Sequence, residues 1–104
     1  MITAQRHGID IIYKINEADV LKTKILHCMA LLYENMLPGN SDMDDISDLL
    51  GDILLYTFML GKKIGFDFDV LREEMCQKIR ILLINDVREI SAEDLNELSQ
   101  YLGA

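Results

Sequence analysis

The sequence predicts an all-α protein, an antiparallel helical bundle of about four to five helices that is completed by dimerisation. Half of the 104 residues are hydrophobic, and Pro38 is the single proline. Apolar residues recur at helical spacing rather than in alternation. The stretch 53–60 is apolar on nearly every side. A helix of that kind needs neighbours on several faces, some of them from a second chain.

The helix that organises the chain is expected over residues 42–63. Ser41 is its expected N-cap, and Gly65 is its expected residue just past the C-cap. Acidic residues gather at its start and Lys62 and Lys63 lie near its end, which complements the helix macrodipole. Its apolar positions recur at helical spacing: Ile46, Leu49, Leu50, Ile53, Leu54, Phe58 and Met59.

Further helices are expected on both sides. A short helix from Ile9 ends near Asn16, which then caps a second helix over 17–36. The segment 37–40, Leu-Pro-Gly-Asn, breaks that helix, so 17–36 and 42–63 form an antiparallel hairpin. Asp67 is expected to cap a helix over 68–84, and Ser91 a short last helix over about 92–102. We expect these helices to form one domain over 1–104.

The charge balance limits the partners. Eighteen Asp and Glu residues against ten Lys and Arg give a net charge of −8, which disfavours binding to nucleic acid phosphates. An acidic surface fits a divalent cation or a basic protein partner, although a solvated acidic surface is the commoner explanation. Cys28 and Cys76 lie in apolar helical patterns and are expected to be reduced. Without a signal peptide or an apolar run of ~20 residues, we expect a cytoplasmic protein that does not contact membranes.

Two short motifs resemble the MazG-like family of all-α nucleoside triphosphate pyrophosphohydrolases. They are Leu-Gly-Asp-Ile-Leu-Leu-Tyr at 50–56 and Leu-Gly-Lys-Lys-Ile-Gly-Phe-Asp at 60–67, and the likeness covers roughly 21–80. The resemblance implies two helices that each project a pair of carboxylates, three residues apart. In the family these carboxylates hold Mg²⁺, which binds the triphosphate and activates a water molecule.

Carried onto this sequence, the four carboxylate positions of the family fall on Cys28, Leu31, Leu49 and Asp52. Only Asp52 suits Mg²⁺, because leucine has no donor atom and a thiol is a soft ligand. The resemblance therefore implies a degenerate metal site, and no cofactor is expected. Lys78 and Arg80 match basic residues that face the nucleotide phosphates in the family.

A rearranged site is the alternative. Such a Mg²⁺ site would be built from residues that share one face of each hairpin helix, namely Asp48, Asp52, Glu34 and His27. Acidic residues at a helix start are also favoured by the macrodipole, which explains Asp48 without a metal. Asp52 has a simple structural role if it pairs with Lys78 or Arg80.

Three functions remain open. The first is a MazG-like protein that has lost its Mg²⁺ site and binds a protein partner through its acidic face, or a nucleotide without hydrolysis. The second is an active, Mg²⁺-dependent nucleoside triphosphate pyrophosphohydrolase with a rearranged site. The third is an unrelated acidic helical interaction or inhibitor protein. The first is preferred, so we expect a homodimer that is not an enzyme.

Overall fold

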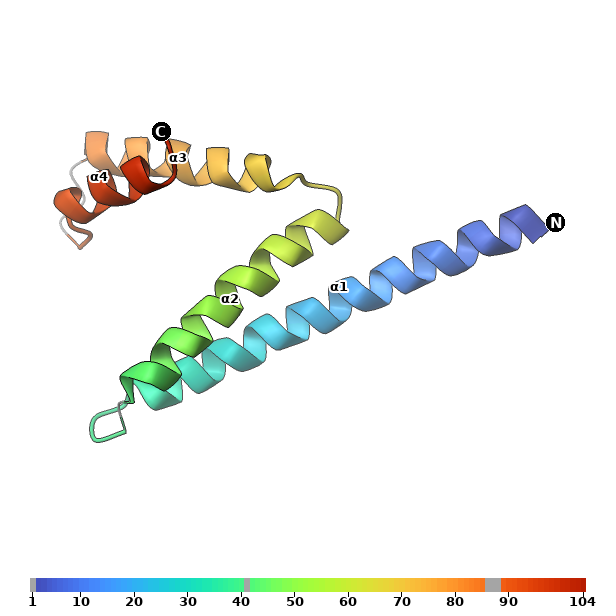
Figure 1. Cartoon of the computed structure of the whole chain (residues 1–104), viewed down its shortest axis with the longest axis horizontal. Coiled ribbons are helices and arrows are strands. Elements are labelled where there is room, and N and C mark those ends of the chain that lie inside the picture. Colours follow the sequence, from blue (N-terminus) through green and yellow to red (C-terminus); the bar gives the residue numbers. More distant parts are fainter. Residues whose placement is uncertain (1, 41, 86–88) are drawn as a thin grey trace. The chain divides into compact units, whose positions relative to one another are not determined.

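The structure is a computed structural model, and it describes residues 2–40, 42–85 and 89–104. Four α-helices and no strand lie in these ranges, which confirms the all-α prediction and its helix count (Figure 1). The helices belong to two compact units, Met1–Phe66 and Asp67–Ala104. Completion of the bundle by dimerisation stays a prediction, as does the single domain over 1–104. Within the described ranges, no helix combines the length and apolar character that crossing a bilayer requires.

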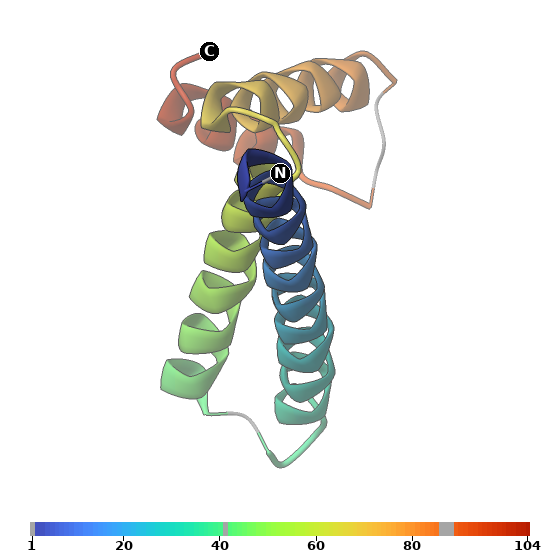
Figure 2. The same cartoon turned by 90° about the vertical axis from the view of Figure 1, so that its right-hand side faces the viewer.

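The first unit is a helical hairpin. Helix α1 (Ile2–Asn35) packs against α2 (Met43–Lys63), and the two run antiparallel (Figures 1 and 2). In the turn between them, the Asn40 N–H donates to the Leu37 carbonyl at 3.1 Å. Gly39 has φ +84°, a left-handed conformation that glycine adopts without steric cost. The hairpin predicted from the Pro-Gly turn is confirmed.

Helix α1 is longer than the sequence predicted. We expected a break at Asn16 between two helices, but α1 continues from Ile2 to Asn35, so Asn16 lies inside a helix and caps none. A residue acts as an N-cap only where a helix begins. Between residues 9 and 35 there is neither proline nor glycine to break the helix.

Both ends of α2 are capped by local hydrogen bonds. Asp42 is the N-cap, and its carboxylate accepts from the N–H groups of Asp44 and Asp45 at 3.0 and 3.4 Å. The expected cap, Ser41, lies outside the described residues. At the other end Gly65 has φ +106°, and the Phe66 N–H donates to the Gly61 carbonyl at 2.8 Å, which completes a Schellman motif. The predicted role of Gly65 is confirmed.

The second unit pairs α3 (Phe68–Asn85) with α4 (Ala92–Tyr101). Its buried core consists of Cys76, Ile79 and Leu95. Ser91 is the N-cap of α4, as predicted, and its hydroxyl accepts from the Asp94 N–H at 3.2 Å.

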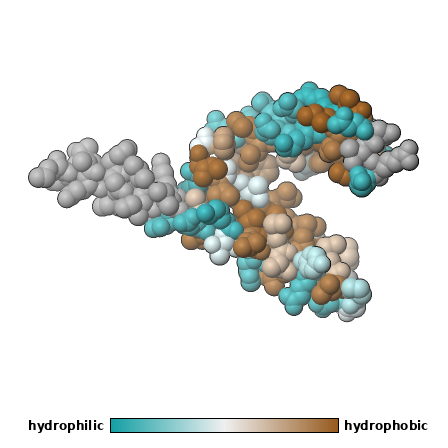
Figure 3. All heavy atoms as spheres, turned by 180° about the vertical axis from the view of Figure 1, so that it is seen from behind, coloured by the Kyte–Doolittle hydropathy of each residue, from teal (hydrophilic) through white to brown (hydrophobic). Residues whose placement is uncertain are grey.

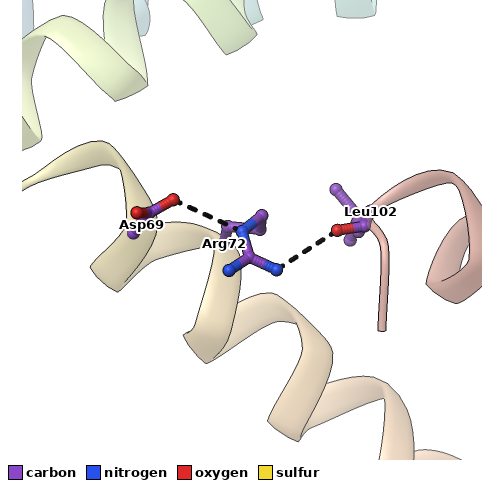
Figure 4. A network of polar contacts seen from close by, with 3 residues as sticks. All are labelled: Asp69, Arg72 and Leu102. Atoms are coloured by element: carbon purple, nitrogen blue, oxygen red, sulfur yellow. Dashed lines mark hydrogen bonds and ion pairs between the residues drawn. The ribbon is translucent and has the colours of Figure 1, made fainter.

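A polar contact also joins α3 to the end of α4 (Figure 4). The Arg72 guanidinium donates to the Leu102 carbonyl at 3.2 Å and to the Asp69 carboxylate at 3.5 Å. The carbonyl of Leu102, the C-cap residue of α4, thereby gains a charged donor.

The buried core of the hairpin is small. Among its described side chains, the hydrophobic ones that are buried are Cys28 and Ile46. Much apolar surface remains exposed, and Figure 3 shows hydrophobic residues gathered over this part of the chain. The exposed large hydrophobic side chains of the hairpin include Leu26, Met29, Tyr33, Met36, Met43, Leu50, Leu54 and Leu55. Exposed apolar surface of this extent is typical of interaction sites.

Candidate functional site

The candidate site lies on the facing sides of α1 and α2, where the resemblance put the two carboxylate pairs. The first pair of positions holds Cys28, which is 7% exposed, and Leu31, which is half-buried. The second pair holds Leu49 and Asp52, which are both half-buried. Because α2 is the helix that packs against α1, the burial of these positions indicates that both pairs lie toward the interior of the hairpin.

Residues beside these positions are more exposed. His27 and Met29 flank Cys28 and are exposed, and so are Leu50 and Gly51, which lie between Leu49 and Asp52. A spacing of three residues keeps both members of a pair on one side of a helix. The burial of the four positions agrees with two pairs that each lie on one side of a helix, but three of the four side chains are apolar or a thiol.

The residues of the rearranged site lie mostly in solvent. His27, Glu34 and Asp48 are exposed, and Asp52 is half-buried. Across the described part of the chain, no three or more His, Cys, Asp or Glu side chains are grouped so that they could hold a metal ion. The four side chains of the rearranged site are therefore not gathered into such a group. The assignment of Asp48 and Asp52 alone as metal ligands stays a prediction.

The two basic residues expected to face a nucleotide lie on α3, in the second unit. Lys78 and Arg80 are both exposed. The Lys78 ammonium lies 3.9 Å from the Glu74 carboxylate, one helical turn earlier. Phosphate binding by Lys78 and Arg80, and the pairing of either with Asp52, stay predictions.

Sequence reasoning missed an ion pair that joins the two hairpin helices. The Lys63 ammonium of α2 contacts the Glu17 carboxylate of α1. Their side chains are 34% and 27% exposed, so solvent screens this pair less than a fully exposed one. The two residues are far apart in the sequence, and no local spacing connects them. Only the register of α1 against α2 brings them together.

A groove of about 580 Å³ lies beside this ion pair. Its apolar lining comes from Val20 and Leu21 of α1 and from Leu55, Tyr56 and Met59 of α2. The Lys24 ammonium lies 5.7 Å from the centre of the Tyr56 ring, within the range of a cation–π contact. Two contacts between α1 and α2 therefore lie at this groove, the Glu17–Lys63 ion pair and the Lys24–Tyr56 contact.

These observations define a class: an all-α protein in which a two-helix hairpin carries a pair of buried or half-buried positions, three residues apart, on each helix. The chain matches the model of the MazG-like family over residues 11–96, and it belongs to that family. The match covers α1 from residue 11 onward, all of α2 and α3, and the start of α4. No curated protein and no solved structure matches the chain at a significant level.

Proposed function

We propose that this chain is a MazG-like protein that acts by binding and does not hydrolyse nucleotides. The observation that carries the proposal is the set of side chains at the four family positions: Cys28, Leu31, Leu49 and Asp52. Mg²⁺ takes hard oxygen ligands, and of these four residues only Asp52 supplies them. One carboxylate is too few to hold the cations that neutralise a triphosphate in its transition state.

The proposed binding partner is a protein, approached through exposed surface of the hairpin. Support comes from the exposed apolar residues of α1 and α2 and from the net charge of −8. A nucleotide held by Lys78 and Arg80 without turnover is the second form of the same role. We place this role in the cytoplasm, whose reducing conditions keep the two buried thiols, Cys28 and Cys76, free.

We also propose that the chain is a homodimer. The exposed apolar residues of α2 recur along one side of the helix, with Leu50 46% and Leu54 57% exposed. A second chain packed on this side would bury them and would enlarge a core that is small in the hairpin alone. The proposed dimer does not depend on the loss of the metal site. Either proposal, the homodimer or the non-hydrolytic role, can therefore be refuted without the other.

The test of the proposed function is an assay of pyrophosphate release. We expect no Mg²⁺-dependent release from the common nucleoside triphosphates above a buffer blank. The Asp52→Ala variant serves as the matched control, because it removes the remaining carboxylate of the four positions. Release by the parent chain that disappears in Asp52→Ala would overturn the proposal and favour an active enzyme with a rearranged site.

A further inference from the structure

The turn end of the α1–α2 hairpin carries a second groove, which the degenerate site does not involve. Its volume is about 450 Å³, and we call it the methionine groove. It is lined by Met29, Leu32, Tyr33, Met36 and Leu37. Four of these side chains are exposed, with Tyr33 77% and Met36 60% accessible. Met29 and Tyr33 lie in the last turns of α1, and Met36 directly follows its last residue; because the three recur every three or four residues, they continue one stripe.

The sequence on both sides of the methionine groove residues is acidic. Between residues 25 and 61 the sequence contains no lysine or arginine, whereas it contains the carboxylates of Glu34, Asp42, Asp44, Asp45, Asp48 and Asp52. The first turn of α2, which carries Asp44 and Asp45, lies at the same end of the hairpin as the last turns of α1 (Figure 1), where Met29, Leu32 and Tyr33 line the groove. Glu34 and the four aspartates from 42 to 48 are exposed. Carboxylates without intervening cations give this end of the hairpin a negative potential.

We propose that the methionine groove binds a basic amphipathic helix of another protein. The apolar face of such a helix, with anchors at i, i+3, i+4 and i+7, fills the groove. Its lysine and arginine side chains then lie near the acidic first turn of α2. Methionine is unbranched and polarizable, so Met29 and Met36 adapt to apolar side chains of different shapes. This inference rests on the binding role proposed above and names the partner and the surface for it.

A second copy of this chain is the competing occupant. A symmetric dimer centred on the methionine groove would bring two identical acidic turns together, and like charges that face each other across an interface oppose association. The dimer proposed above uses Leu50 and Leu54 of α2 instead, and neither residue lines the groove. Charge complementarity therefore favours a basic partner over a second copy.

The test uses a fluorescent 18-residue probe peptide, with leucine at helical spacing and lysine at the other positions, titrated with the full chain. We expect saturable binding that weakens as NaCl is added, because salt screens the acidic rim. A matched peptide with glutamate in place of lysine should not bind. Circular dichroism of each preparation verifies that the protein is folded.

Two sets of variants locate the site. The double variant Met29→Gln/Met36→Gln should weaken binding about tenfold, whereas Ile84→Gln, an exposed apolar position of α3, should not change it. Asp44→Asn/Asp45→Asn should weaken binding about tenfold at low salt. Its matched control is Glu93→Gln/Asp94→Asn, which removes two acids from the first turn of α4.

Three results would overturn the inference. The first is the absence of peptide binding by folded protein. The second is equal weakening by the α2 and α4 acid variants, which would mean that the peptide responds to total charge. The third is loss of self-association in Met29→Gln/Met36→Gln, which would mean that a second copy fills the groove. An assay of pyrophosphate release by the same preparations separates the two proposals. If the protein releases pyrophosphate and still binds the peptide, only the non-hydrolytic role is refuted. If it neither releases pyrophosphate nor binds the peptide, only the groove proposal is refuted.

Discussion

Restoring carboxylates at the family positions should make the stability of this chain depend on Mg²⁺. The triple variant Cys28→Glu, Leu31→Glu and Leu49→Glu, together with Asp52, would recreate both carboxylate pairs. Without metal it should be strongly destabilised. Cys28 is 7% exposed, and an unpaired buried ion costs several kcal/mol, while the half-buried positions cost less. A chain of this size has a total stability of about 5–15 kcal/mol, so the metal-free variant should be close to unfolding.

Mg²⁺ should recover part of this loss. A ligand that binds only the folded state stabilises it by about 2.7 kcal/mol at a concentration one hundred times its dissociation constant. Urea melts followed by circular dichroism, at increasing MgCl₂, measure the gain. The parent chain should show no comparable dependence on MgCl₂, because Asp52 is the single carboxylate of its four positions.

A single substitution covers the case in which the triple variant does not fold. Leu49→Glu creates one pair with Asp52 at half-buried positions, and Leu49→Gln is its uncharged match. Mg²⁺ should raise the stability of Leu49→Glu and leave Leu49→Gln unchanged. Equal responses of the two variants, or a folded triple variant that ignores Mg²⁺, would show that these positions do not converge as the family correspondence requires.

Three further predictions concern stability and assembly. Asp52→Asn should change the free energy of unfolding by less than about 1 kcal/mol, whereas a loss of about 3–5 kcal/mol in a urea melt would reveal a buried ion pair instead. The parent chain should sediment as a homodimer at micromolar concentration and Leu54→Glu as a monomer; a monomeric parent would contradict the proposed dimer. Glu17→Gln should cost about 1 kcal/mol, because the partly buried pair with Lys63 is lost, while Asp19→Asn, which breaks an exposed pair, should cost less. Equal losses in the last two variants would show that the cross-hairpin pair adds nothing.

Features set by a few neighbouring residues could be predicted from the sequence. The turn at 37–40, the glycine after α2 and the Ser91 cap depend on local chemistry that is visible within four or five positions. The break expected at Asn16 failed for a related reason. A residue that is able to cap a helix does so only if its own backbone is not helical. Asn16 lies inside the continuous helix α1, so it cannot act as a cap.

The candidate site could be predicted only in part. The spacing of three and the resemblance indicated the facing positions, and their burial agrees with that expectation. The Glu17–Lys63 pair and the two grooves depend on how α1 lies against α2 and on which apolar faces remain uncovered. No periodicity within a single helix carries that information, so it required the structure.

The distribution of charge on the hairpin gives the binding proposal a physical basis. Carboxylates that face one another inside a hairpin repel and are poorly solvated unless a metal ion neutralises them, so they reduce stability. At three of the four interior positions this chain has apolar or thiol side chains, which are stabilised by burial instead. The turn end of the hairpin carries exposed carboxylates, where solvation keeps their free-energy cost low and where they remain available to a cation-bearing partner: Glu34, Asp42, Asp44, Asp45 and Asp48. The interior positions of the hairpin are thus predominantly apolar and its turn end carries exposed carboxylates, and on this basis we propose protein recognition rather than phosphate chemistry.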